Sequence, residues 1–392
     1  IIGIIFGALP GLSATLGIAL LTTVTYSLNL STEASMVALV GIYVGAIYGG
    51  SHPAILLNIP GTGAGAATAV EGYPLNLQGR GGETIGTATV MSFIGTVFGV
   101  LAMLLFIPIL TKTALLFQSV QYFLLALFGV MICGSLTSPD TPIKGWIMGL
   151  LGLLLACVGM DPMHGHQRFT FGIPELIGGI TPIPVILGGF AIPQIIQTIA
   201  KRKKASDDKS PTQKVTKVWP NLRVIRRKFT MAVRSGLIGI GVGSIPGVGE
   251  DIAAWLSYDI SKKTSKEKDQ YGKGSLEGVI AAETANNACI GGALIPLLTL
   301  GIPGSPPAMM LLGAIMLNGI VPGPRLPVEY PQFIPQMSAI LMWASFAMLI
   351  CGFVMSRVSI HVLRIPVAIL MPVVALFAVI GSYSFDFTLF NV

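Results

Sequence analysis

Charged side chains are scarce in this sequence of 392 residues. Asp, Glu, Lys and Arg make up 10% of it, whereas apolar residues make up 53% and the mean hydropathy is +0.78. This balance excludes an ordinary soluble domain and a disordered chain. Several apolar segments instead reach the roughly 17–25 residues that a helix needs to cross a bilayer.

Cysteine and histidine are equally rare, with four of each. The cysteines are isolated within apolar runs, so the sequence predicts neither a disulfide framework nor a metal centre. His164 and His166 form the one close histidine pair. Because no third ligand lies nearby, a turn carrying surface histidines is a better interpretation of this pair than a metal site.

Catalytic and nucleotide-binding motifs are also missing. No HExxH or GxSxG context is present, so we do not expect an enzyme. The glycine-rich run Gly61–Gly65 lacks a preceding strand, and no Gly-Lys-Ser/Thr P-loop exists. We therefore expect no bound cofactor and no use of ATP by this chain.

What the sequence does contain is a pair of interrupted apolar runs. The run from Tyr48 to Tyr73 breaks at Pro60-Gly61, and the run from Gly291 to Ala314 breaks at Pro303-Gly304. Proline removes a backbone donor, and in lipid such a break persists only where the freed groups line a cavity or meet a ligand. Two broken helices in corresponding places indicate the binding site of a transporter.

A second pair of breaks shows that the chain is duplicated. Leu9-Pro10-Gly11 corresponds to Ile245-Pro246-Gly247 at a separation of 236 residues, and Ile59-Pro60-Gly61 corresponds to Ile302-Pro303-Gly304 at 243. Because the two separations nearly agree, both breaks belong to one repeated unit.

The predicted fold is an all-α polytopic membrane protein with two inverted-topology repeats, built from broken helices or re-entrant hairpins. We expect one transmembrane repeat over residues 1–200, a basic cytoplasmic linker over 201–230 and a second repeat over 231–392. Ile1 lies inside an apolar run, so we expect the chain to lack helices at one or both ends. The candidate spans are Met36–Asn58, Thr84–Leu110, Ser119–Thr137, Lys144–Gly159, Leu176–Ala200, Met231–Tyr258, Phe333–Met355 and Leu363–Tyr383.

The distribution of Lys and Arg predicts the orientation. Eleven of the 24 lie between Lys201 and Lys228, which indicates a cytoplasmic loop more than a nucleic-acid patch. Ser27–Ser35 has no basic residue, whereas the corresponding Lys262–Gly274 has five lysines. Opposite charge character places these loops on opposite sides of the membrane. Met231–Tyr258 has basic residues on both sides, so we expect a re-entrant hairpin that turns at Pro246-Gly247.

Each break should end in a new half-helix whose free N–H groups carry partial positive charge. A substrate carboxylate would be stabilised there without a lysine, and glycine at 61 and 304 would let it approach the backbone. A flexible kink that serves packing is the alternative. The candidate substrate-binding residues are Ser13, Ser51, Asn58, Pro60, Gly61, Thr62, Gly63, Pro303, Gly304 and Ser305.

Two acidic clusters are candidates for coupling to a co-transported sodium ion or proton. Glu283, Asn286 and Asn287 offer the oxygen ligands that a hard cation prefers, although the asparagines could equally join helices by hydrogen bonds. Glu250 and Asp251 lie beside a break, where they could couple cations or cap the helix that follows.

Four stretches together resemble a known family. Leu9-Pro10-Gly11, the segment from Tyr48 to Pro74, Arg168–Gly172, and Ala285–Ala288 with the later Gly301–Gly304 are similar to the large membrane subunit of tripartite tricarboxylate transporters, the TctA family. The resemblance covers essentially the whole chain. It implies an inner-membrane, multi-pass permease of bacteria or archaea that imports carboxylates of the tricarboxylate or dicarboxylate class by a sodium or proton gradient.

The resemblance also implies partners, namely a small TctB-type membrane subunit and an extracytoplasmic TctC-type binding protein. The chain departs from the commoner family pattern at Glu250-Asp251 and at Ser51-His52-Pro53, so citrate itself is not predicted. A passive anion channel or another integral membrane transport subunit is the alternative function. We expect the lipid bilayer to be the chain's surroundings and no nucleic acid to be a partner.

Overall fold

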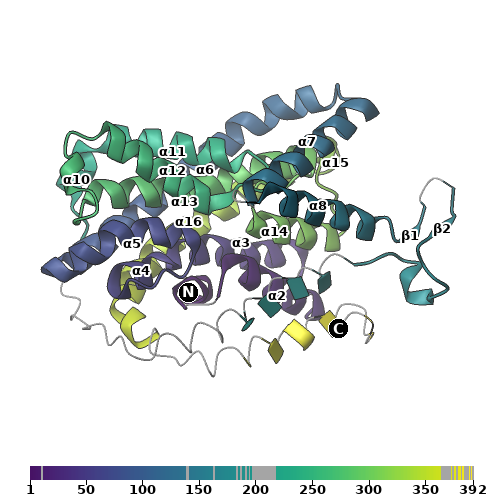
Figure 1. The fold of residues 1–392 in the computed structure, drawn as a ribbon, viewed down its shortest axis with the longest axis horizontal. Helices are drawn as coiled ribbons and strands as arrows, with labels where there is room; N and C mark the ends of the chain where they lie inside the picture. Colours follow the sequence, from purple (N-terminus) through teal and green to yellow (C-terminus); the bar gives the residue numbers. More distant parts are fainter. Residues whose placement is uncertain are drawn as a thin grey trace.

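The computed structural model of the chain is built from helices that pack side by side (Figure 1). It describes residues 1–9, 12–137, 141–161, 164–181 and 218–362, with isolated positions between 184 and 196 and between 372 and 390. Its helices are α1 (Ile2–Ala8), α2 (Ala14–Ser27), α3 (Thr32–Gly49), α4 (Ser51–Leu57), α5 (Gly63–Leu75), α6 (Gly81–Ala114), α7 (Ser119–Thr137), α8 (Pro142–Ala156), α10 (Leu222–Arg227), α11 (Phe229–Gly243), α12 (Gly249–Thr264), α13 (Leu276–Leu300), α14 (Pro306–Leu317), α15 (Leu326–Glu329) and α16 (Phe333–Val362).

Other regular structure in the described chain is confined to short pieces. An antiparallel pair joins β1 (Gly159–Met160) to β2 (Gln167–Arg168). Single turns of π- or 3₁₀-helix cover Asn76–Arg80, Pro174–Leu176 and Lys268–Gln270.

Three helical segments of the described chain are long and apolar enough to cross a membrane: Thr32–Leu57, Gly63–Ala114 and Phe333–Ser356. Many large apolar side chains face outward, as on α7, where Phe123 is 65% exposed. Lipid accepts such a surface, whereas water would not. The all-α polytopic membrane fold is therefore confirmed. Most of the basic linker and parts of the expected spans Leu176–Ala200 and Leu363–Tyr383 lie outside the described residues.

Helix α13 is the central element, and almost all of its residues are buried. Glycines let its neighbours approach closely. A Cβ added at Gly95 of α6 would meet the Thr284 carbonyl oxygen, and one at Gly239 of α11 would meet that of Ala285. Such small residues at a crossing give helices in lipid their van der Waals contact.

Helices α11 and α12 form a hairpin against α13. The guanidinium of Arg234, near the start of α11, donates to the Thr264 hydroxyl at the end of α12 over 2.8 Å. Nearby, the Ser261 hydroxyl lies 3.0 Å from the Met231 sulfur. The start of α11 and the end of α12 therefore lie at the same end of the molecule. The chain reverses between them, as expected for a hairpin that turns at Pro246-Gly247.

The two halves repeat their internal contacts residue by residue. In each of the pairs given below, a Cβ added to the first-named glycine would press on the backbone of the second residue. Every residue of a first-half pair has its counterpart in the second half either 236 or 243 positions later. The matching pairs are Gly3–Ile42 with Gly239–Ala285, Gly7–Ala46 with Gly243–Cys289, Gly49–Ile4 with Gly292–Ile240, and Gly61–Gly7 with Gly304–Gly243. The duplicated breaks thus belong to duplicated packing.

The long helices of the two halves run in opposite directions. Leu56, at the end of α4, packs in one cluster with Leu276 at the start of α13. Thr32, at the start of α3, instead lines a pocket with Asn318, which follows α14 beyond the far end of α13. Inverted repeats require this antiparallel relation between corresponding helices. That the two halves are oppositely oriented in the membrane stays a prediction.

A buried carboxylate joins the end of α5 to the second half. Glu71 is fully buried and accepts hydrogen bonds from the Tyr258 hydroxyl at 2.7 Å and the backbone N–H groups of Gly272, Gly274 and Ser275 at 2.6, 3.0 and 2.7 Å. Four donors offset the cost of burying this group. Because three of them are backbone N–H groups of the loop before α13, Glu71 fixes that loop to α5.

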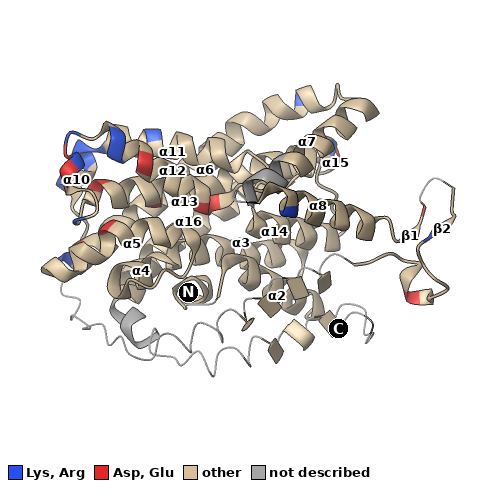
Figure 2. Ribbon diagram, in the orientation of Figure 1, with Lys and Arg blue, Asp and Glu red and all other residues tan. Residues whose placement is uncertain are grey.

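Most basic residues of the described chain gather at one end, over α10 and the neighbouring ends of α11 and α12 (Figure 2). There Lys228 forms an ion pair with Glu277 at the start of α13. The Lys262–Gly274 loop lies at this end, beside Glu71, whereas Glu33 in the Ser27–Ser35 loop lies near Asn318. The two loops are thus at opposite ends of the bundle, and their predicted placement on opposite sides of the membrane stays a prediction.

Glycine substitutions on α11 test the close crossing with α13. We expect Gly239→Ala to lower the apparent Tm of the purified protein, since its Cβ meets the Ala285 backbone and overpacking costs about 1–3 kcal/mol. Gly241→Ala is the matched control: no atom lies within 4 Å of its added Cβ, so Tm should hold or rise. An equal change of Tm in the two variants would contradict the close contact between α11 and α13.

Candidate functional site

The helices that follow the two breaks, α5 and α14, both begin at one cavity of about 330 Å³, here called the central cavity. Its walls come mainly from the first residues of four helices, α2, α5, α12 and α14. The lining residues at these helix starts are Ser13, Ala14 and Thr15; Gly61, Thr62, Gly63 and Ala64; Gly247, Val248, Gly249, Glu250 and Asp251; and Pro306 and Pro307. Residues some 240 positions apart in sequence therefore share one enclosure.

The electrostatics of the central cavity follow from this convergence. The amino-terminal end of a helix carries about half a positive elementary charge, and its first N–H groups have no partner inside the helix. The lining contains no Lys or Arg, and its charged members are Glu250 and Asp251. The cavity thus combines the positive ends of four helices with two carboxyl groups.

The start of helix α5 is capped and contacts a carboxylate of the second half. The Thr62 hydroxyl oxygen accepts a hydrogen bond from the Gly65 N–H at 3.0 Å, which caps the helix. The Ala64 N–H donates to the Asp251 carboxylate at 2.7 Å. A carboxylate from α12 of the second half therefore already occupies the position that the sequence suggested for a substrate carboxylate.

The start of α14 is chemically different. The Ser305 oxygen accepts from the Ala308 N–H at 3.3 Å, so this terminus is also capped. Its first two positions are Pro306 and Pro307, however, and proline has no N–H to donate. The first turn of α14 therefore lacks the N–H groups that were expected at both half-helices, whereas the binding of an anion at α5 stays a prediction.

Glu250 links the halves across the cavity wall. Its carboxylate accepts a hydrogen bond from the Tyr43 hydroxyl of α3 at 2.5 Å and another from the Ser305 hydroxyl at 2.8 Å. Because Glu250 and Asp251 are neighbours in the first turn of α12, this helix contacts both α14 and α5 through its two acids.

Gly61 and Gly304 allow the broken segments to pack closely against neighbouring helices. A Cβ at Gly61 would press on the Gly7 carbonyl oxygen, and one at Gly304 would press on that of Gly243. The Gly304 carbonyl in turn accepts from the Gly249 N–H at 3.2 Å. The missing side chains thus permit backbone contact between the broken segments, and the space is not left for an anion as the sequence suggested.

Six of the ten predicted substrate residues lie outside the lining of the central cavity: Gly304 and Ser305, whose contacts are given above, and Ser51, Asn58, Pro60 and Pro303. Ser51 is buried in α4 and donates to the Tyr48 carbonyl at 2.8 Å, while Asn58 ends α4 with a left-handed φ of 56°. Pro60 is exposed in the extended segment before α5. Pro303 lines a separate apolar pocket between α7, α8 and the break before α14. The predicted break residues Pro10 and Gly11 lie outside the described residues.

The predicted cation-coupling residues on α13 are buried beside the central cavity. Glu283 accepts from the Thr68 hydroxyl of α5 at 2.6 Å and from the Ser92 hydroxyl of α6 at 2.9 Å. Asn286 and Asn287 are 2% and 0% exposed, respectively. Thr68 lies one helical turn after Ala64, so α5 contacts an acid of the second half at two successive turns.

Sequence reasoning missed several lining residues. Ala14 and Thr15 could have been found, because Ser13 before an apolar run is a typical N-cap, and its oxygen accepts from the Leu16 N–H at 3.2 Å. Tyr43, which lies outside the lining but contacts the lining residue Glu250, had no such signal. Its contact with Glu250 joins residues 207 positions apart.

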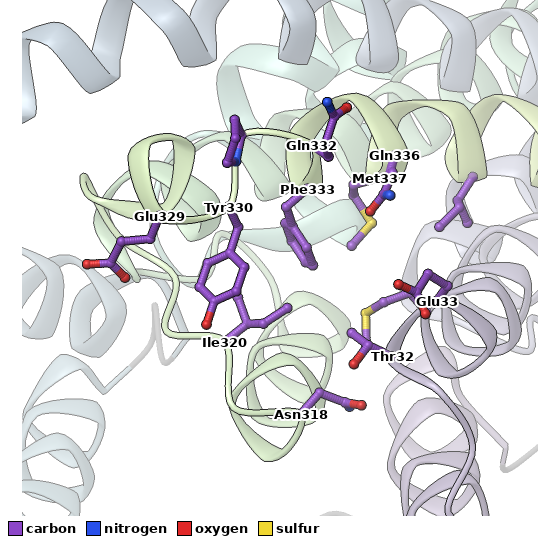
Figure 3. A pocket seen from close by; sticks show the side chains of 13 residues that line it. Thr32, Glu33, Asn318, Ile320, Glu329, Tyr330, Gln332, Phe333, Gln336 and Met337 are labelled. Carbon is purple, nitrogen blue, oxygen red and sulfur yellow. The ribbon is translucent and has the colours of Figure 1, made fainter.

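A larger pocket of about 410 Å³ lies at the start of α3, where Thr32 and Glu33 face Tyr330 and Phe333 across the opening (Figure 3). No predicted site residue lines it. The predicted surface histidine turn is observed at His164, which is exposed and contacts Asp161 at 3.0 Å.

An all-α membrane protein whose broken helices begin at a common internal cavity is a transporter component. The comparison with family models agrees: residues 1–392 match the tripartite tricarboxylate transporter TctA family. The chain belongs to this family.

Two relatives come from Agrobacterium vitis. A 52.8 kDa protein in the TAR-I ttuC′ 3′ region is 35% identical over 392 residues, which cover 100% of this chain and 77% of the relative. A protein in the TAR-II ttuC′ 3′ region is 36% identical over 151 residues, which cover 38% of this chain and 62% of the relative. No solved structure matches the chain.

Thiol labelling tests whether the central cavity admits water. In a variant whose four native cysteines are replaced by alanine, we expect Thr62→Cys to react with a water-soluble methanethiosulfonate. Thr68→Cys is the matched control on the same helix and should stay unlabelled, since Thr68 is 1% exposed. Protection of both thiols would show that the cavity is closed to solvent.

Proposed function

We propose that this chain is the permease subunit of a binding-protein-dependent secondary transporter that imports carboxylates of the tricarboxylate or dicarboxylate class. The observation that carries the proposal is the convergence of four helix amino termini on the central cavity. Helix amino termini bind carboxylates through backbone N–H groups and the helix dipole. The cavity volume lies at the lower end of the range for small-molecule sites, which suits a small organic acid.

The family supports the setting of this reaction. A tripartite transporter has further subunits, and we propose a small TctB-type membrane subunit and an extracytoplasmic TctC-type binding protein as the partners. The location would be the inner membrane, which the chain crosses several times, with the basic linker in the cytoplasm.

The charges of the cavity support ion coupling. A substrate anion would enter a space that holds Glu250 and Asp251 and no basic side chain. Like charges disfavour one another strongly where water is excluded, so an additional cation or proton must balance them. We propose that a sodium ion or a proton accompanies the substrate, and that its gradient drives uptake.

Asp251 has a specific part in this proposal. It holds the Ala64 N–H at 2.7 Å, so a substrate carboxylate that binds the α5 terminus must take over this donor. Asp251 would act as an internal stand-in for the substrate, and release of its contact would accompany substrate binding.

Reconstitution tests the function directly. Proteoliposomes that contain the chain with its small subunit and binding protein should concentrate a radiolabelled dicarboxylate or tricarboxylate against its gradient when a sodium or proton gradient is imposed. The acid would be chosen by thermal-shift screening of the binding protein. Equilibration without concentration under every imposed gradient would instead support a passive anion channel.

Charge removal at Asp251 tests the location of the substrate. We expect Asp251→Asn to lower the KM for the carboxylate about fivefold, because removing one like charge near the α5 terminus relieves about 1 kcal/mol of repulsion. Lys144→Gln, on α8 and outside the cavity lining, is the control and should retain wild-type KM. Loss of uptake in Lys144→Gln together with a wild-type KM in Asp251→Asn would instead show that a lysine outside the central cavity holds the anion.

A further inference from the structure

Glu283 is a buried carboxylate without a cationic partner. It is 0% exposed, and no ion pair of the described chain involves it. Its contacts are the hydroxyl groups of Thr68 and Ser92 at 2.6 and 2.9 Å. Two hydroxyl groups offset only part of the cost of burying a charge, so a positive charge at this position would be strongly favoured.

Two amide oxygens next to Glu283 have no hydrogen-bond partner. The Oδ1 atoms of Asn286 and Asn287 are buried and unpartnered. Residues three and four positions apart lie on one face of a helix, so both side chains share the α13 face of Glu283. Buried polar atoms in native proteins are almost always satisfied, and two orphans beside one unpaired carboxylate point to a ligand.

The orientation of both amides is fixed by their NH₂ groups. The Asn287 Nδ2 donates to the Glu283 carbonyl oxygen at 3.0 Å, and the Asn286 Nδ2 donates to the Ile47 carbonyl oxygen at 3.5 Å. Exchanging nitrogen and oxygen in either amide would place two acceptors against each other. The unpartnered atoms are therefore oxygens, which accept hydrogen bonds or coordinate cations.

We propose that Glu283, Asn286 and Asn287 form a binding site for a monovalent alkali cation, with the Thr68 and Ser92 hydroxyl oxygens at its edge. Carboxylate, amide and hydroxyl oxygens are the ligands of hard cations. The site carries one formal negative charge, which a monovalent ion neutralises, whereas a divalent ion would leave a buried positive charge. The proposal is distinct from the central cavity, whose lining includes none of these residues.

The cation site shares helix α5 with the central cavity. Thr68 contacts Glu283, and Ala64, one turn earlier, contacts Asp251 in the cavity. A cation at Glu283 therefore sets the position of the helix whose terminus would hold the substrate. This coupling role rests on the function proposed above, whereas cation binding itself does not.

Equilibrium binding of radioactive sodium to the purified protein tests the site without substrate, with choline keeping the ionic strength constant. We expect saturable binding by the wild type and at least about tenfold weaker binding by Glu283→Gln, which keeps the size of the side chain. Asn287→Ala should also weaken binding, and competition by potassium chloride would show which alkali ion is preferred.

Glu277→Gln is the matched control on the same helix. Its carboxylate pairs with Lys228 and accepts from the Ser265 hydroxyl at 2.6 Å, so its loss should leave sodium affinity unchanged. Absence of saturable alkali-cation binding by the wild type, or equal affinity in Glu283→Gln, would overturn the site. Carboxylate uptake driven by a proton gradient alone would then still support the proposed function, so the two failures are distinguishable.

Discussion

The structure depends on the requirement that every backbone polar group in an apolar surrounding finds a partner. The breaks at Pro60-Gly61 and Pro303-Gly304 meet this requirement in the same way. Asn58 and Gly301 turn the chain with left-handed backbone, and the N–H groups of Ile59 and Ile302 return to the carbonyls six residues earlier at 3.2 and 3.3 Å. Thr62 and Ser305 then cap the next helix. Interrupted helices are thereby stable without water, and their amino termini are free to point inward.

Inward-pointing amino termini determine the chemistry of the interior. Four positive helix ends around one cavity attract negative charge, and the chain supplies Glu250 and Asp251 there with no lysine or arginine. The two acids also connect the halves, since Glu250 reaches Tyr43 and Asp251 reaches Ala64. The electrostatic compensation and the joint between the two units are therefore made by the same two adjacent residues.

The sequence carried enough information for the breaks, the duplication and the hairpin, because Pro-Gly interruptions and loop charges are local signals. The all-α membrane class followed from composition. The placement of Ser51 and Asn58 away from the cavity could not be predicted, since only packing decides which way the side chains before a break face. The absence of N–H groups at Pro306 and Pro307, by contrast, is evident from the sequence itself. Tyr43 and Thr68 act through partners more than 200 positions away, and no local pattern predicts such contacts.

Glu71 attaches one end of helix α5 firmly to the second half of the chain. Four hydrogen bonds fix the carboxyl-terminal end of the helix to Tyr258 and the loop before α13. Gly63, at the opposite end of α5, lies farthest from this attachment. Thr68 lies between these two ends, so in the proposed coupling a shift at Glu283 would reach the start of α5 through the Thr68 contact.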